Sequence, residues 1–359
     1  MVWQEEPRGG FPDLALFRGL SGIEQMRAFI RGQAPPPPLA YLTGMRPTDA
    51  SVGSSAFTMP ASGWLLSPQG LISGGVLAVL ADGPLGGAVQ TALPPATAYA
   101  TYELSLAMLR PVTADGGTLV GRGQLVHGGR SLALSEVFIL DPRGRLVTHG
   151  SSRCFVFPPL EPGEPPDPAL LQPSKPTFAT PHPFERPAEG EVVAGEVWES
   201  LDGLTMLKAH IAGDLPAPPI ARLTGLHPVD VAAGEAVFAL PATGWLCTPH
   251  GNLEGGAIAL LADSAVAAAV QTTVPAGAGY ATIDLKVNFL RPVPPDGAEL
   301  TASARVVHRG ATMAAATAEV RNAAGKKVAL ASGSAMIVPH PVTAAHPVTP
   351  VEDPPGQER

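Results

Sequence analysis

The sequence contains little cysteine, few aromatic residues and no excess of positive charge. Its 359 residues include two cysteines, and phenylalanine, tryptophan and tyrosine together make up 5% of the chain. Hydrophobic cores must therefore be built mainly from alanine, valine and leucine. No metal-ligand spacing surrounds either cysteine, and this usage fits a reducing, cytoplasmic compartment. The net charge of −8 argues against nucleic acid or an anionic membrane as a partner, because their phosphates would be repelled.

Signals for export or for membrane insertion are also missing. Acidic residues stand near the N-terminus, where a secretion signal would carry positive charge. The apolar run 255–274 is about long enough to cross a bilayer. Its counterpart at 74–93, however, carries an aspartate at the same place and also contains Pro84. Because a charge at the centre of a membrane span is expensive, we expect a cytoplasmic protein without such a span.

An internal repeat dominates the sequence. A shift of 181 residues aligns 20–158 with 201–339 without a gap, and about fifty aligned positions are identical. A repeat of this length indicates a domain duplication, since solenoid repeats are several-fold shorter. We expect a first domain at 14–158 and a second at 195–339. The clearest matches are LTGMRP (42–47) with LTGLHP (223–228), PASGWLLSPQG (60–70) with PATGWLCTPHG (241–251), and GGVLAVLADGPLGGAVQT (74–91) with GGAIALLADSAVAAAVQT (255–272).

Proline-rich segments separate and follow the two copies. The segment 159–194 is dense in proline and glutamate, so we expect it to form neither sheet nor helix and to act as a semi-rigid linker. Residues 340–359 form a second proline-rich stretch, which we expect to be a disordered tail. Neither segment shows a residue pattern with an identifiable chemistry.

In the second copy, hydrophobic periodicity predicts one long helix among several strands. Residues 255–272 are apolar on nearly all sides, so this helix is expected to be buried throughout. Residues 201–211 resemble a short amphipathic helix. This order of elements predicts an α+β fold in which an antiparallel sheet wraps around one central helix. Stretches bounded by turns predict strands at 234–240, near Trp245, and at 283–289, 299–308, 312–321 and 327–338.

The start of the long helix carries the candidate chemistry. Both copies place two glycines in its first turn, at 74–75 and 255–256. An aspartate follows eight residues after the first glycine in each copy, at Asp82 and Asp263. Free backbone N–H groups at a helix start bind negative charge, and glycine lets a ligand approach them closely. An unpaired carboxylate inside an apolar helix is costly, so each aspartate needs a partner or a function.

Within a single helix, the N-terminal amide and the aspartate are too far apart to act on the same carbon atom. Eight helical residues separate the amide end from the carboxylate by about 12 Å, at 1.5 Å per residue. Two antiparallel copies lying side by side would place Gly74 opposite Asp263 and Gly255 opposite Asp82. The duplication supplies such a pair of helices within one chain.

Three strings resemble the PaaI-like family of hotdog-fold acyl-CoA thioesterases. They are the helix start GGAIALLAD (255–263), the strand TIDLKVNFLRP (282–292) and the turn VVHRG (306–310). The resemblance covers both copies and implies a tandem, or double, hotdog protein. It further implies hydrolysis of acyl-CoA without a metal or an organic cofactor. Relatives often pair, so a homodimer of double hotdogs is expected.

The resemblance also implies roles for individual residues. In this family the first glycine donates its N–H to the thioester oxygen, a carboxylate of the partner helix acts as general base or nucleophile, and a strand hydroxyl helps to hold water. The implied catalytic residues are Gly74, Asp82 and Thr101 of the first copy and Gly255, Asp263 and Thr282 of the second. The implied substrate-binding residues are Gly75, Gly256, Ser73, Glu254, Ser67, Thr248, Arg130 and Arg309.

Within that set, this sequence departs from the family at two places. Ser73 and Glu254 stand where many relatives have histidine, while Ser67 and Thr248 stand where asparagine is frequent. The arginines near the later turn are candidate contacts for CoA phosphates, because a guanidinium suits phosphate geometry. A solvated arginine is an equally good interpretation.

Several other residues have simpler interpretations. His127 and His308 match each other at a strand end, but nothing at catalytic spacing accompanies them, so a turn role is favoured. Trp64 and Trp245 are expected to anchor a core or an interface. Cys247 is expected to be a small buried hydrophobe, since no histidine lies at a spacing that would activate it.

A non-catalytic acyl-CoA-binding module, acting as a sensor or carrier on the same fold, is the main alternative. The missing family histidine favours it, as does Pro84, which removes a helical hydrogen bond at a cost of about 3 kcal/mol. If the two sites differ, we expect Asp263 and Gly74 to form the active one. A hydroxyacyl dehydratase of the same fold would need a histidine beside the helix start, where His250 of one copy is the sole candidate.

Overall fold

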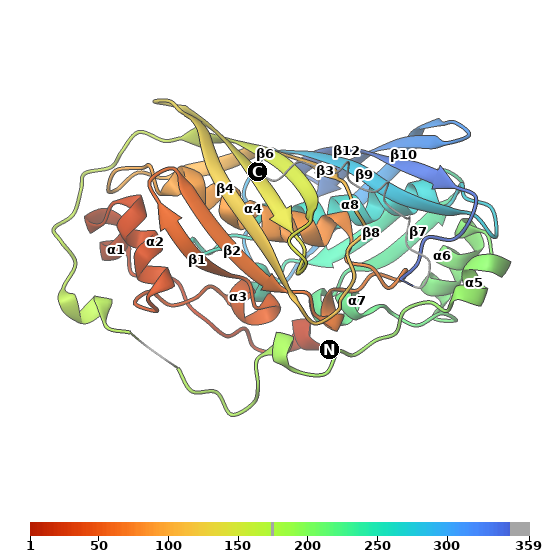
Figure 1. Cartoon of the computed structure of the whole chain (residues 1–359), viewed down its shortest axis with the longest axis horizontal. Coiled ribbons are helices and arrows are strands. Elements are labelled where there is room, and N and C mark those ends of the chain that lie inside the picture. Colours follow the sequence, from red (N-terminus) through yellow and green to blue (C-terminus); the bar gives the residue numbers. More distant parts are fainter. Residues whose placement is uncertain (174–175, 345–359) are drawn as a thin grey trace.

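One antiparallel sheet runs through both copies of the repeat. The computed structural model describes residues 1–173 and 176–344 (Figure 1). The first-half strands are β1 (Arg46–Ser51), β2 (Ser54–Pro60), β3 (Tyr99–Met108), β4 (Thr118–Gly128), β5 (Leu132–Leu140) and β6 (Leu146–Val156). The second-half strands are β7 (His227–Ala232), β8 (Glu235–Pro241), β9 (Gly279–Phe289), β10 (Glu299–Arg309), β11 (Met313–Arg321) and β12 (Lys327–Val338). They form a 12-stranded sheet in the order β1-β2-β4-β5-β6-β3-β9-β12-β11-β10-β8-β7.

The sheet wraps around two long helices, α4 (Gly74–Gln90) and α8 (Gly255–Gln271), of 17 residues each. Both helices lie inside the curved sheet and pack against each other (Figure 1). This arrangement confirms the predicted α+β fold with one central helix in each half. The shorter helices are α1 (Leu14–Gly19), α2 (Gly22–Ile30), α3 (Pro38–Thr43), α5 (Gly195–Ser200), α6 (Gly203–Ala212) and α7 (Pro219–Thr224).

The two halves join through the pair β3–β9 at the middle of the sheet. Leu104 pairs with Val287 and Leu106 with Leu285, and all four side chains are buried in the core beneath the helices. Because β3 and β9 run antiparallel, they place the two halves in an approximately twofold relation. That relation sets α4 and α8 side by side.

The predicted elements of the second half are largely observed, with one correction. The long helix ends at Gln271, and β12 has the predicted bounds. The stretch near Trp245, predicted as a strand, is instead a 3-10 helix, η5 (Gly244–Leu246). Its backbone closes tight turns, with the Leu246 N–H donating to the Thr243 carbonyl, so it does not extend into the sheet. The first half has the same turn in η2 (Gly63–Leu65).

Pro84 does not break α4, which continues to Gln90. Strand β4 accommodates the proline because it places Gly121 and Gly123 beneath it. A Cβ at Gly121 would lie 3.0 Å from Pro84 Cγ, so a larger residue there would crowd the ring. The Ser55 hydroxyl donates to the Pro84 carbonyl at 2.9 Å. The first helix is therefore intact at the place where the sequence suggests damage.

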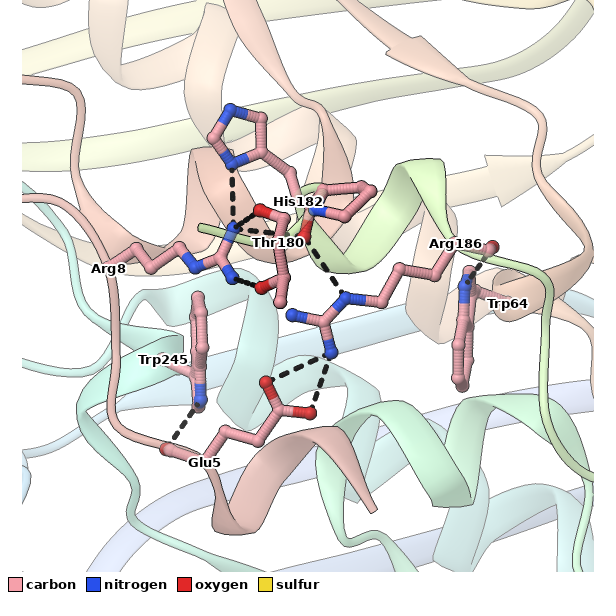
Figure 2. Close-up of polar contacts among 8 residues, drawn as sticks. Glu5, Arg8, Trp64, Thr180, His182, Arg186 and Trp245 are labelled. Atoms are coloured by element: carbon pink, nitrogen blue, oxygen red, sulfur yellow. Dashed lines mark hydrogen bonds and ion pairs between the residues drawn. The ribbon is translucent and has the colours of Figure 1, made fainter. Parts of the chain in front are cut away.

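The segments that precede the two halves cross over to the opposite half (Figure 2). Trp245 Nε1 donates to the carbonyl of Glu5 at 3.0 Å, and Trp64 Nε1 donates to the carbonyl of Arg186 at 2.9 Å. Glu5 and Arg186 are 181 residues apart and form an ion pair at 2.7 Å. The repeat thus extends upstream of the region where sequence identity reveals it. Both tryptophans are buried anchors, as expected.

The linker and the tail differ in part from expectation. The linker contains two short 3-10 helices, η3 (Pro168–Leu171) and η4 (Pro183–Glu185), where no helix was predicted. Another 3-10 helix, η1 (Val2–Gln4), opens the chain. Val342 of the expected tail is buried against Leu71, while residues 345–359 lie outside the described part of the structure. None of the helices in 1–173 and 176–344 is both long and apolar enough to span a bilayer.

Candidate active site

The N-terminus of each long helix meets the aspartate of the other. Asp263 Oδ2 accepts a hydrogen bond from the Gly75 N–H at 2.7 Å. Asp82 Oδ2 accepts one from the Gly256 N–H at 3.0 Å. The opposite-half arrangement inferred from the eight-residue spacing is therefore present. The amide that holds the carboxylate, however, belongs to the second glycine of each pair.

The second glycines are required by the close approach of the two helices. A Cβ at Gly75 would lie 2.8 Å from Leu260 Cα, and one at Gly256 would lie 2.6 Å from Val79 Cα. These are backbone atoms that are unable to move aside independently. Glycine here allows helix packing. That same packing brings each carboxylate to a helix start, where the helix dipole stabilises its charge.

The first glycine of the pair, Gly74, has a backbone N–H that is available to a ligand. Its N–H belongs to the first turn of α4, where helical amides have no partner within the helix. No acceptor for this N–H is found among residues 1–173 and 176–344. A Cβ at Gly74 would lie 3.4 Å from Asp263 Oδ1, and that oxygen likewise has no partner in the described structure. A donor and a carboxylate oxygen are thus adjacent and both unused.

These groups line a cavity of about 600 Å³. Five of the residues expected from the sequence lie on its wall and come from both halves of the chain. They are Ser67, Ser73, Gly74, Asp263 and Thr282. Ser73 also caps α4, because its hydroxyl accepts from the Val76 N–H at 3.4 Å. The cavity is large enough for a sizeable small-molecule group.

The remaining wall of the cavity runs along α8 and is mainly apolar. Small residues of the helix lie on it at helical spacing, at Ser264, Ala267 and Ala268. Near the end of α8, Gln271 Oε1 accepts a hydrogen bond from the Tyr280 hydroxyl at 3.1 Å. The cavity therefore extends from Asp263 towards the C-terminal end of α8.

Several of these wall residues were missed by sequence reasoning. The cavity-lining residues that were not predicted are Phe238, Tyr280, Gln271, His210, Arg110 and Arg222. One signal was available in the sequence. The cavity stripe Ser264, Ala267 and Ala268 aligns with three glycines in the first copy, so the two helices have different faces at this place.

Burial sets the protonation of the site. Loss of solvent raises the pKa of Asp263 to about 6, and the hydrogen bond from the Gly75 amide acts in the opposite direction. The pKa of Asp82 is also raised to about 6 by burial, against the amides of Gly256 and Gly255. Both carboxyl groups are therefore mostly ionised at neutral pH yet close to titration, as suits a general base.

Other residues expected from the sequence do not line this cavity. Thr101 Oγ1 lies 3.7 Å from Cys154 Sγ, and Thr248 Oγ1 accepts from the His250 N–H at 3.2 Å. Arg309 Nε donates to Thr273 Oγ1 at 3.1 Å, just beyond the C-terminus of α8. Arg130 is exposed in the turn between β4 and β5. Contact between these arginines and CoA stays a prediction.

Known proteins share this architecture. A model of the thioesterase superfamily matches residues 250–329. A variant of the phenylacetic acid degradation protein PaaI from Thermus thermophilus is 33% identical over 33% of this chain and 97% of its own, with a TM-score of 0.30. PaaI from E. coli is 27% identical over 40% of this chain and 100% of its own, with a TM-score of 0.35.

A longer chain, the acyl-CoA thioesterase II TesB2 from Mycobacterium marinum, is 14% identical over 83% of this chain and 96% of its own, with a TM-score of 0.48. No curated protein matches the sequence. The superfamily match lies within the second copy of the repeat. The chain is a tandem hotdog protein and belongs to the thioesterase superfamily.

Proposed function

We propose that this protein hydrolyses an acyl-CoA thioester to the free acid and CoA, at the site formed by Gly74 and Asp263. One observation carries the proposal. A helix-start amide without an acceptor in the described structure lies beside a buried carboxylate of the opposite half, and both line one cavity. Membership of the thioesterase superfamily supports the same reaction class.

The Gly74 N–H supplies the electrostatic part of the reaction. When the thioester carbonyl is attacked, negative charge develops on its oxygen. A fixed backbone donor at a helix start stabilises that charge, and removing such a donor typically costs about 100- to 1000-fold in rate. Gly74 suits this role because a side chain at this position would collide with Met108 and crowd Asp263.

Asp263 supplies the second part, as general base or as nucleophile. As a base it takes a proton from water, which then attacks the carbonyl carbon. As a nucleophile it attacks the carbon itself, and water hydrolyses the resulting anhydride. In both routes the C–S bond breaks and the CoA sulfur leaves as a thiolate that is then protonated. Thr282 lines the same cavity, and its hydroxyl would hold the water.

The cavity along α8 is the proposed place of the acyl group. Its wall includes small residues of the helix together with Phe238 and Tyr280, an environment that favours an apolar chain. Arg110 and Arg222 line the same cavity and would supply positive charge for CoA phosphates. Association of chains into a homodimer and a cytoplasmic location stay predictions from the sequence.

A thiol-release assay tests this function. Purified protein is incubated with a series of aliphatic acyl-CoA substrates and with phenylacetyl-CoA, and free CoA is titrated. The Asp82→Asn/Asp263→Asn double variant should release thiol at most about 0.01 times as fast as the unmodified chain. Asp49→Asn is the matched control, since Asp49 is an exposed aspartate of β1. Unchanged turnover in the double variant would refute the mechanism.

The same assay separates the alternative function. A non-catalytic acyl-CoA-binding protein would bind the substrate tightly and release no thiol over hours. The absence of the family histidine at Ser73 motivates keeping this comparison. Binding measured in parallel by calorimetry therefore distinguishes a carrier from a hydrolase.

A further inference from the structure

The two ends of the helix pair have matching backbones and different surroundings. At one end Asp263 receives the Gly75 amide, and at the other Asp82 receives the Gly256 amide. We call the first the open end, made by Gly74 and Asp263, and the second the closed end, made by Gly255 and Asp82. Neither residue of the closed end lines the large cavity, although both are partly exposed.

Three glycines on α4 account for part of this difference. Gly83, Gly86 and Gly87 take the places of the cavity-lining Ser264, Ala267 and Ala268 of α8. A Cβ at Gly83 would lie 3.0 Å from Phe57 Cδ1, and one at Gly86 would lie 2.5 Å from the Tyr99 hydroxyl. These aromatic side chains therefore pack directly on the helix.

Their counterparts in the second half behave differently. Phe238 and Tyr280 line the open cavity instead of contacting the helix backbone at glycines. Ser264, Ala267 and Ala268 of α8 line the same cavity. In the first half the aromatic side chains therefore contact the helix, at places where the second half has residues that line the large cavity.

Glu254 accounts for the rest of the difference. It directly precedes Gly255 and is 6% exposed, and its Oε2 has no hydrogen-bond partner in the described structure. Its counterpart at the open end is the much smaller Ser73, which caps its own helix. Burial, followed by the charge of Asp82, raises the pKa of Glu254 well above its usual range.

We infer that the closed end is a second copy of the reaction site blocked by the chain's own side chains, Glu254 at the helix start and Phe57 with Tyr99 along α4. Each chain consequently binds one acyl-CoA, although it contains two amide–carboxylate pairs. The inference rests on the proposed function, because it takes the open end as the site that binds the thioester.

Reciprocal exchange of Ser73 and Glu254 tests the inference. The ligands are oxoalkyl-CoA thioethers, which keep the carbonyl group but do not hydrolyse, and the readout is stoichiometry by equilibrium dialysis. The unmodified chain should bind one equivalent of either a long or an acetyl-sized analogue. Glu254→Ser should bind a second equivalent of the acetyl-sized analogue but not of the long analogue. Phe57 and Tyr99 still contact α4 where a long acyl chain would lie. Glu254→Gln, which keeps the size of the side chain, should bind one.

The opposite exchange closes the open end. Ser73→Glu should weaken binding of both analogues by about 100-fold, since it places a carboxyl group beside Asp263 where the carbonyl would lie. Thermal unfolding of each variant shows that the fold is kept. Two equivalents bound by the unmodified chain, or one by folded Glu254→Ser, would overturn the inference.

The outcomes remain distinct from those for the proposed function. Binding of one equivalent without thiol release from the matching acyl-CoA contradicts hydrolysis and leaves the closed end as inferred. Thiol release together with two bound equivalents contradicts the closed end and leaves hydrolysis standing.

Discussion

The two halves of this chain share a fold and differ in how their central helix is packed. On α4, glycines let Phe57 and Tyr99 contact the helix. On α8, serine and alanine at the same positions line a cavity of about 600 Å³. The comparison shows that both halves keep the same amide–carboxylate geometry, and that close helix packing requires glycine at its second position. We propose that the side chains around each amide–carboxylate pair decide separately whether it can bind substrate.

The largest expected difference between the halves lies in their aspartates. Asp263→Asn should lower kcat by about 1000-fold, because a positioned base or nucleophile is lost together with its charge. Asp82→Asn should lower kcat by less than about threefold, since we place Asp82 at the closed end. Steady-state thiol release measures both. Equal losses in the two variants would show that the halves work alike.

A dependence on pH should follow from the same carboxylate. The pKa of Asp263 is raised to about 6 by burial, and the ionised form is the reactive one. Turnover should therefore fall as the pH decreases through 6, by about tenfold per unit below it. Asp82→Asn should keep this profile although Asp82 has a similar pKa. A pH profile that shifts when Asp82 is replaced would show that Asp82 controls the titration, and would contradict the prediction.

Narrowing the α8 cavity should change the choice of substrate. Ala267→Leu adds three carbon atoms to the wall, so we expect about a tenfold loss of kcat/KM for the longest acyl-CoA accepted. Acetyl-CoA, whose acyl group stays near Asp263, should be hydrolysed with little change. Competition between long and short substrates measures the ratio directly. Equal losses for both lengths would place the acyl group elsewhere.

Much of the fold could be predicted from the sequence, because the relevant signals are periodic or local. Local sequence patterns were enough to predict the repeat, the bounds of the long helix and the alternating pattern in β9. The placement of Gly74 near Asp263 also followed, since a helical rise of 1.5 Å per residue excludes action within one helix.

Other features depend on contacts that a single sequence does not display. The crossing of Glu5 and Arg186 to opposite halves is invisible because these equivalent positions carry unlike residues. Pro84 was expected to damage α4, yet Gly121 and Gly123 of a distant strand make room for it. The glycines of α4 were readable, but not which aromatic side chains would contact them.

The helix contact itself should depend on the second glycines. Gly75→Ala should destabilise the fold by about 2 kcal/mol, because its methyl group would press on the Leu260 backbone. Gly256→Ala should cost a similar amount, since its contact with Val79 is equally close. Gly195→Ala, at the start of α5 with open space around it, is the control. Denaturant unfolding that ranks Gly195→Ala beside the other two would contradict the packing argument.

The crossing segments should show the smallest effect. Arg186→Ala removes the ion pair to Glu5 but keeps the backbone carbonyl that holds Trp64. Because the Glu5 side chain is 40% exposed, we expect a loss below about 1 kcal/mol in unfolding free energy. Thermal unfolding with and without salt measures it. A loss of several kcal/mol would mean that the ion pair, rather than the tryptophan anchors, fastens these segments.

The most direct test of cooperation between the halves is a crystal structure of Asp263→Asn with unhydrolysed acyl-CoA. We expect the thioester oxygen to accept a hydrogen bond from the Gly74 N–H, with the acyl chain beside Ala267 and Ala268 and no ligand at Gly255. A thioester bound at Gly255 and Asp82, or away from both helix starts, would contradict the account.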